Sequence, residues 1–384
     1  MQLASESIAI CVLSIDISVK YIYNYDIGVL PRMINAWSEF QPLKKIILGR
    51  AFPPDTFDWH GNREQRESMR QIFEETEEDL QSLVKIFKDA GVKVVRPKNI
   101  FTINGEEQVN LPWMKCGYPN HPLMPRDTLF PYGNTMFEMF TGSDNRYFEN
   151  MAYYNINWYE WMVGQEWISM PGVMVNTGQD YTNFESDNKL IYHAANMIKL
   201  GDTVLCSQPH AGDPKRGKGT TWGKEWIARM VNRLYPNTRF IDIPVGGHID
   251  GKIAILKPGV VITWNKEWIP EQMKNWDIIE INDTHDMPED FLATRKRRFH
   301  REYVSKWLSH WIGYADESVF DVNVLSIDEE TVIVTGDDKQ ARNEIEKRGI
   351  NTVYWRWRHQ YFWDGGIHCL TSDLIREGNR ESYI

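Results

Sequence analysis

One local pattern recurs along this chain and restricts its fold more than any single motif does. It consists of two β-strands joined by a tight turn, then a helix, then a third strand. Turn signals at Gly133-Asn134, Gly201-Asp202 and Pro258-Gly259 each separate two apolar runs, an arrangement typical of β-hairpins. The units recur about every 60–75 residues, a spacing typical of radially repeated folds. A closed ring of such units protects the strand edges and leaves a central channel.

The first and last units contain the same elements with less obvious turns. A strand at Leu43–Gly49 precedes a helix at Glu64–Ala90, whose apolar side chains recur at helical spacing up to Gly91. The other expected elements are strands or hairpins at Val92–Val95, Thr128–Met139, Asn196–Cys206, Arg239–Ile243, Lys252–Trp264, Val322–Thr335 and Thr352–Arg356, and helices at Tyr147–Val163 and Trp222–Leu234. Alternating helices and strands of this kind predict the α/β class.

Composition excludes several classes of protein. The chain has 384 residues, of which 42% are hydrophobic, so it can bury a large core. A net charge of −10 argues against a nucleic-acid partner and suits a cationic small-molecule substrate. No apolar run reaches the length of a membrane span, and no basic segment precedes Ile8–Leu13, so we expect neither a membrane protein nor a signal peptide. Four cysteines at irregular spacing indicate a reducing compartment, the cytoplasm, and no disulfide framework or zinc site.

The strongest candidate for a reactive residue is Cys369, within Gly365-Gly366-Ile367-His368-Cys369-Leu370-Thr371. The two glycines allow backbone and substrate to approach closely, and a thiol beside polar groups can ionise to the nucleophilic thiolate. We expect this segment to be strand-like. Because a lone cysteine is more often a small buried side chain, the assignment depends on partners elsewhere in the chain.

Two distant segments supply such partners. Met124-Pro125-Arg126-Asp127 and Gly247-His248-Ile249-Asp250-Gly251 each lie beside an apolar run that we expect to be a strand. On a strand, the alternating His248 and Asp250 would share one face. The same ordered series includes Arg146-Tyr147-Phe148-Glu149 and Asn323-Val324-Leu325. From Glu39 to the C-terminus, the series resembles the arginine amidinotransferases of the pentein-type propeller superfamily.

The resemblance implies a fold and a chemistry. The fold is a five-bladed, pseudo-symmetric α/β propeller of ββαβ modules, here residues 37–384 after an N-terminal extension at residues 1–36. The chemistry moves the amidino group of L-arginine to an amine through an S-amidino-cysteine, with no metal and no organic cofactor. Cys369 would be the nucleophile and His248 the acid and base. Asp127 and Asp250 would hold the planar guanidinium, and Asn323 belongs to the same substrate-binding set. We leave open whether the protein is a homodimer.

The chain departs from the family pattern beside the catalytic histidine. Relatives have a Phe-Asp-Ala-Ala segment whose aspartate completes a triad with the cysteine and the histidine, whereas this chain has Tyr192-His193-Ala194-Ala195. Either His193 orients His248 as a neutral imidazole, or a nearby acid such as Glu185 or Asp187 replaces the aspartate. These residue types alone do not decide between the two.

A second departure concerns the acceptor. Glu267 and Asp321 stand where glycine-using relatives have an arginine and a serine that bind the acceptor carboxylate. Two acidic side chains would repel a carboxylate and attract a cation, so we expect a positively charged amine without a carboxylate. Such an acceptor is an arginine-derived amino ketone, as used by the amidinotransferases of saxitoxin-type toxin biosynthesis.

Three other functions are compatible with these residues. A glycine amidinotransferase of the cylindrospermopsin type is the second candidate. A guanidine hydrolase, such as a deiminase, would use the same residues and admit water, and a non-catalytic binding propeller would need a purely structural Cys369. The stretch Gly212–Thr220 nearly matches a phosphate-binding loop, but Gly219 stands where a Ser or Thr should bind magnesium. We therefore interpret this stretch as a basic surface loop.

Overall fold

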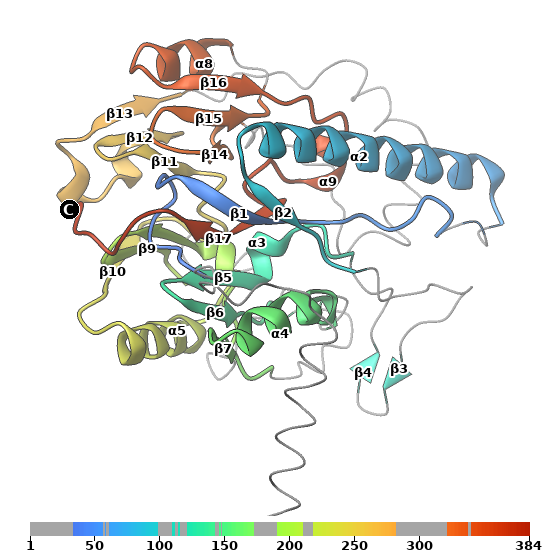
Figure 1. The fold of residues 1–384 in the computed structure, drawn as a ribbon, viewed down its shortest axis with the longest axis horizontal. Helices are drawn as coiled ribbons and strands as arrows, with labels where there is room; N and C mark the ends of the chain where they lie inside the picture. The colour runs from blue at the N-terminus through green and yellow to red at the C-terminus, as the bar shows by residue number, and fades with distance from the viewer. Residues whose placement is uncertain are drawn as a thin grey trace, which may run out of the picture. The chain divides into compact units, whose positions relative to one another are not determined.

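The chain divides into two units, Met1–Arg32 and Met33–Ile384. The computed structural model (Figure 1) describes residues 34–56, 58, 61–98, 110–111, 114–115, 121–142, 146, 148–172, 190–209, 218–281, 321–336 and 339–384. The extension at residues 1–36 falls almost wholly outside this set, so its boundary stays a prediction. Glu185, Asp187 and most of the loop Gly212–Thr220 also lie outside the described residues.

The described residues form short strands and helices in regular alternation. The strands are β1 (Leu43–Leu48), β2 (Lys93–Val95), β3 (Asn110–Leu111), β4 (Met114–Lys115), β5 (Leu129–Tyr132), β6 (Thr135–Glu138), β7 (Glu166–Ser169), β8 (Met197–Leu200), β9 (Thr203–Ser207), β10 (Arg239–Ile243), β11 (Ile253–Lys257), β12 (Val260–Thr263), β13 (Asp277–Glu280), β14 (Leu325–Ser326), β15 (Thr331–Val334), β16 (Asn351–Tyr354) and β17 (Thr371–Arg376). The α-helices are α2 (Arg63–Asp89), α3 (Pro125–Thr128), α4 (Tyr154–Met162), α5 (Thr221–Leu234), α8 (Lys339–Glu346) and α9 (Gln360–Trp363), and the 3₁₀ helices are η2 (Glu149–Tyr153), η3 (Ala194–Asn196), η5 (Lys266–Trp268) and η6 (Glu271–Met273).

Five three-stranded sheets have the same topology, which confirms the predicted five-bladed α/β propeller. In each sheet an antiparallel pair is extended by a third strand that runs parallel to the second. The sheets are β17-β1-β2, β5-β6-β7, β8-β9-β10, β11-β12-β13 and β14-β15-β16. In four of the sheets the crossover contains an α-helix: α2, α4, α5 or α8. In the sheet β11-β12-β13 the crossover contains the 3₁₀ helices η5 and η6 instead.

The two ends of the propeller chain meet in one sheet. The last strand, β17, pairs antiparallel with the first, β1, and Figure 1 shows the red and blue arrows side by side. The first unit therefore has a complete hairpin although its two strands lie at opposite ends of the sequence. The sequence analysis predicted the strand Leu43–Gly49 without this partner, because pairing over more than three hundred residues leaves no local signal.

The first strands of the sheets are largely buried. All residues of β5 and β8 are buried, β17 contacts β5, and β11 contacts β14. These strands therefore lie next to one another in the interior, and the loops that lead into them are brought close together. Among the described residues, no helix combines the length and apolar character needed to cross a bilayer.

Helix α2 shows how the repeat packs its crossovers. Its apolar positions face the sheet at helical spacing, and the helix ends before Gly91, which has a φ of 74°. Two buried tryptophans from the last sheet and helix α9 fix it: Trp355 Nε1 donates to the carbonyl of Asp79, and Trp363 Nε1 donates to Thr76 Oγ1. The buried side chains along this face are Met69, Ile72, Phe73, Thr76, Leu80, Leu83, Val84 and Phe87.

The hairpin turn of the third sheet, between β8 and β9, packs against the C-terminal tail. Gly201 has a φ of 67°, and a Cβ there would lie 1.9 Å from the carbonyl oxygen of Glu381, in the tail that follows β17. Gly259, in the next hairpin, has a φ of 79° and nothing within 4 Å of an added Cβ. Both alanine variants bear the left-handed backbone strain of about 1–2 kcal/mol. Gly201→Ala must also displace the C-terminal tail.

We therefore expect Gly201→Ala to lower the free energy of unfolding by at least about 1 kcal/mol more than Gly259→Ala does, measured by urea denaturation. Equal losses in the two variants would show that the tail does not stabilise this turn.

Candidate active site

Five of the candidate residues occupy equivalent positions in the five sheets. Each lies two to four residues before the first strand of its sheet: Cys369 before β17, Asp127 before β5, His193 before β8, Asp250 before β11 and Asn323 before β14. Because the first strands are neighbours in the interior, these loops gather their side chains at one end of the ring. The propeller thus brings together residues that are far apart in sequence.

The local structure of the Cys369 and His248–Asp250 segments differs from the prediction, whereas Asp127 lies beside a strand as predicted. The Cys369 segment is a turn at residues 367–370, and Asp127 lies in the short helix α3. His248 and Asp250 were predicted on one strand, which is wrong: residues 247–252 form bends and turns. Gly247 has a φ of 73°, and the N–H of Ile249 bonds to the carbonyl of Ala195, outside any sheet. The alternation of polar residues around buried Ile249 imitates a strand without being one.

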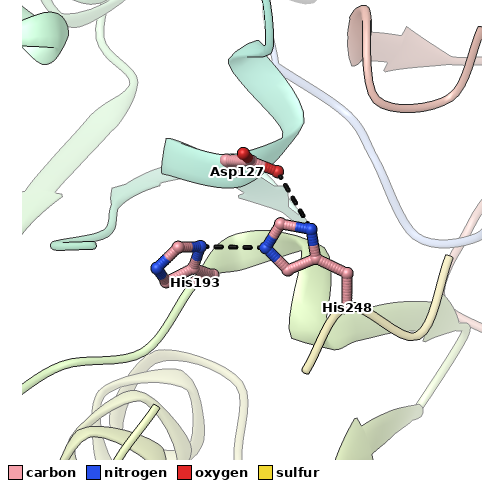
Figure 2. A group of neighbouring side chains, drawn as sticks. All are labelled: Asp127, His193 and His248. Carbon is pink, nitrogen blue, oxygen red and sulfur yellow. Dashed lines mark hydrogen bonds and ion pairs between the residues drawn. The ribbon is translucent and has the colours of Figure 1, made fainter. Parts of the chain in front are cut away.

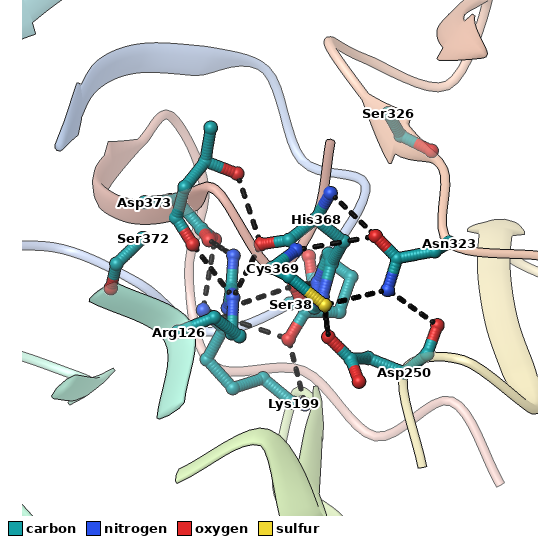
Figure 3. Close-up of polar contacts among 12 residues, drawn as sticks. Ser38, Arg126, Lys199, Asp250, Asn323, Ser326, His368, Cys369, Ser372 and Asp373 are labelled. Atoms are coloured by element: carbon teal, nitrogen blue, oxygen red, sulfur yellow. Dashed lines mark hydrogen bonds and ion pairs between the residues drawn. The ribbon is translucent and has the colours of Figure 1, made fainter. Parts of the chain in front are cut away.

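Cys369 is held tightly by Asn323 and Asp250 (Figure 3). Asn323 Oδ1 accepts the backbone N–H groups of His368 (2.9 Å) and Cys369 (3.2 Å), and its Nδ2 donates to the sulfur at 3.1 Å. The thiol in turn donates to Asp250 Oδ2 at 3.4 Å. Asn323 therefore fixes both the loop and the sulfur, while its predicted contact with substrate stays a prediction.

The surroundings keep this thiol protonated in the free protein. Burial raises the pKa of Cys369 well above its ordinary value, and the charges of Asp250 and Asp127 raise it further. The hydrogen bond from Asn323 lowers the pKa of Cys369, but by less than burial and the two carboxylates raise it. A nucleophile in this state needs a change in the local field before it can attack.

Asp127, His248 and His193 form a chain of polar contacts (Figure 2). His248 Nδ1 lies 3.6 Å from Asp127 Oδ1, and His248 Nε2 lies 2.9 Å from His193 Nδ1. His193 Nε2 lies 3.0 Å from the carbonyl oxygen of Thr141. A carbonyl only accepts, so His193 carries its proton on Nε2 and accepts at Nδ1. His248 must then donate from Nε2, which leaves its Nδ1 for proton transfer on the side of Asp127.

This arrangement places His193 where the sequence analysis expected an orienting group. Burial, followed by the charge of His248, lowers the pKa of His193 well below its ordinary value. Burial, followed by the charge of Lys218, lowers the pKa of His248. A neutral His193 orients the second imidazole by hydrogen bonding and contributes no stabilising negative charge.

Asp127 is held by an ion-pair network that sequence reasoning did not assign to the site. Arg146 Nη1 bonds to Asp127 Oδ2, and Arg146 also makes two bonds to Glu149. Asp127 Oδ1 has no hydrogen bond among the described residues. The i, i+3 spacing of Arg146 and Glu149 was a usable signal for this pair, but not for its contact with Asp127.

Asp250 has a similar environment. Its Oδ2 accepts from His368 Nδ1 at 2.9 Å as well as from the thiol, whereas its Oδ1 has no hydrogen bond within the described part of the chain. His368 Nε2 lies 3.3 Å from Glu39 Oε2. The roles of His368 and Glu39 were also missed, since each is only one polar residue within a buried segment.

One group of side chains has the donor atoms of a metal site. Ligand atoms of Asp127, His193 and His248 lie within 4.8 Å of one another. However, His248 directs one ring nitrogen to each of the other two residues, so the three donors do not converge on one point (Figure 2). We therefore assign no metal to this group.

Of the two residues expected to select the acceptor, one follows β12 and the other precedes β14. Glu267 is an exposed residue of η5. This helix follows Trp264, whose Nε1 donates to the carbonyl of Gly251, next to Asp250. Asp321 is buried, and its Oδ1 packs against Gly336. Their contact with an acceptor stays a prediction.

Curated relatives align with most of the chain, although no family model matches it. The inosamine-phosphate amidinotransferase 1 of Streptomyces griseus is 24% identical, covering 91% of this chain and 99% of the relative. The mitochondrial glycine amidinotransferase of Danio rerio is 24% identical over 91% of this chain and 84% of its own. The L-arginine:L-lysine amidinotransferase of Pseudomonas savastanoi pv. phaseolicola is 25% identical over 91% of this chain and 96% of its own length.

Solved structures agree on the fold. An amidinotransferase of the saxitoxin biosynthetic pathway from Microseira wollei superposes with a TM-score of 0.69 at 21% identity, covering 91% of this chain and 99% of that one. The inosamine-phosphate amidinotransferase of Streptomyces griseus superposes with a TM-score of 0.68 at 22% identity, with the same coverage of both chains. Over nearly its whole length the chain is thus similar to several amidinotransferases, and it shares its propeller fold with two solved ones.

Proposed function

We propose that this enzyme takes the amidino group of L-arginine onto Cys369 and passes it to an amine. One observation carries the proposal: two buried carboxylates flank the thiol, and each has one oxygen without a hydrogen bond among the described residues. These are Asp127 Oδ1 and Asp250 Oδ1. A guanidinium is a planar cation whose N–H groups fit such acceptors. Buried acceptors of this kind are costly unless a ligand fills them.

The same carboxylates explain how the thiol is activated. In the free protein their charges hold the pKa of Cys369 high, in addition to the effect of burial. A bound guanidinium neutralises that field, so the thiol pKa falls when the substrate arrives. Deprotonation is thereby linked to the presence of the electrophile.

His248 supplies the proton transfers. Its Nδ1 accepts the thiol proton, and the thiolate attacks the central guanidinium carbon to form a tetrahedral species. The C–N bond to ornithine breaks as Nδ1–H returns a proton to the departing nitrogen, which leaves an S-amidino-cysteine. An incoming amine in its neutral form then attacks the same carbon and gives a proton to Nδ1. The C–S bond breaks, and the sulfur leaves as the thiolate, which takes that proton back from Nδ1. His193 keeps the His248 ring in place by accepting from its Nε2–H.

The acceptor is proposed to be a cationic amine without a carboxylate. The support is the pair of acids Glu267 and Asp321, and the position of η5 at the end of β12 that is nearest Asp250. The Microseira wollei enzyme is described as part of a saxitoxin pathway, which is compatible with an arginine-derived amino ketone. Glycine, as in the Danio rerio relative, is the second candidate acceptor, and water, which would make the enzyme a hydrolase, is the third.

The first test is mass spectrometry of the intact protein after incubation with arginine alone. We expect one amidino group on Cys369 of the wild type and none on Cys369→Ala. Asp127→Asn and Asp250→Asn keep the shape of the site but remove its charge, so adduct formation should slow by about a hundredfold or more. Adduct formation at normal rates in Cys369→Ala would show that the nucleophile is a different residue.

The second test identifies the acceptor. With guanidino-labelled arginine, label should move to an α-amino ketone that lacks a carboxylate and to simple diamines, but poorly to glycine. Glu267→Arg should raise the preference for glycine by about tenfold, while the isosteric Glu267→Gln should change it less. Efficient transfer of label to glycine, with cationic amines inert, would reject this acceptor. Repeated turnover of arginine without any acceptor, with release of ammonia or urea, would favour a hydrolase.

A further inference from the structure

His368 lies between two carboxylates, and the proposed reaction gives it no role. Its Nδ1 is 2.9 Å from Asp250 Oδ2, and its Nε2 is 3.3 Å from Glu39 Oε2. The side chain is buried, with 6% of the residue exposed. Ionised carboxylates only accept hydrogen bonds, so the geometry calls for a proton on each ring nitrogen.

Glu39 is a fixed acceptor at the far end of this contact. Its Oε1 accepts the backbone N–H of Lys199 at 3.1 Å, and the Lys199 ammonium and Arg126 lie 3.6 and 3.7 Å from its oxygens. Burial acts to raise the pKa of Glu39, but these cations and His368 lower it to about 2. Asp373 in turn binds both cations, so the whole cluster is anchored in the interior.

The ionisation of Asp250 depends on His368 more than that of Glu39 does. Burial acts to raise the pKa of this carboxyl, and the bond to His368 and its charge are the largest opposing influences. Together with His248 they leave the pKa of Asp250 below its ordinary value, although Asp127 raises it. Without His368, the carboxylate would keep the thiol as its only hydrogen-bond donor among the described residues.

Solvent has little room to replace this histidine. The cavity beside it has a volume of about 10 Å³, which corresponds to at most a single water molecule. The backbone of His368 is also fixed, since its N–H bonds to Asn323 Oδ1 and its carbonyl accepts from Arg126 Nε at 3.4 Å. The ring is therefore held in one orientation between its two partners.

We propose that His368 is a positioning residue that holds Asp250 ionised and correctly oriented for the substrate guanidinium, by donating to Asp250 and Glu39 together. This inference rests on the proposed function of Asp250. His368 does not touch the reacting atoms and acts only through the carboxylate. The charged or titratable groups that face this pair are Glu39, Arg126, Asp127, His248 and Cys369.

The direct test follows the titration of the Asp250 carboxyl by ¹³C NMR in the full-length protein. His368→Phe keeps a ring but removes both donors, and the Asp250 midpoint should rise by about one pH unit or more. His368→Asn retains one neutral donor and should cause a smaller rise. An Asp250 midpoint that is unchanged in a folded His368→Phe protein would overturn the proposal.

The functional readout is the pH profile of adduct formation from arginine. A folded-state pKa that rises makes the ionised form disappear at a higher pH as the solution is acidified, so the acid limb of the profile should move up with the midpoint. In an Asp250→Asn background, His368→Phe should change the residual rate less than about twofold. Losses that simply multiply in the double variant would show that the role of His368 is structural.

Two further measurements cover the remaining outcomes. If His368→Phe does not fold, ¹⁵N NMR of the wild type still decides, because both ring nitrogens of His368 should carry protons. A ring with a single proton would contradict the proposal. If the wild type forms no adduct with arginine, the proposed function fails, whereas the carboxyl titration still reports on His368 independently.

Discussion

The pairing of β1 with β17 is the constraint on which the rest of the structure depends. It joins the two ends of the Met33–Ile384 unit into one sheet and so turns five similar modules into a ring. The same pairing places the turn before β17, and with it Cys369, beside the corresponding loops of the other four sheets. The candidate active site, assembled from all five modules, therefore depends on closure of the ring, and no single module contains it.

Within the site, charge matters more than shape. Asp127 and Asp250 are buried next to the thiol, and each is held from behind, by Arg146 in one case and by His368 in the other. Buried carboxylates tolerate this position because their partners neutralise one side and leave the other free for a cation. The same charges raise the pKa of the Cys369 thiol in the free protein. The positive partners thus order the site, while in the proposed function the carboxylates select a guanidinium.

Much of this could be predicted from the sequence, and the failures have identifiable causes. Gly133, Gly201 and Gly259 have positive φ angles in the observed structure, so the hairpin turns were recognisable from local chemistry. The β1–β17 pairing and the Glu39–His368 contact were not, because they join residues more than three hundred positions apart. The strand predicted at His248 and Asp250 failed because an alternating pattern also arises in a turn with one buried residue. The candidate residues were identified individually, but their contacts required the closed ring.

The most direct test of this account is the ionisation of Cys369 with and without a bound cation. Thiolate absorbance can be followed against pH as a difference between the wild type and Cys369→Ser, which removes the contribution of the other cysteines. The account predicts a Cys369 pKa well above the ordinary value in the free protein, and a fall of about two units or more when a non-reactive guanidinium compound saturates the site. A thiolate already present at neutral pH in the free protein, or a pKa that does not change on saturation, would contradict it.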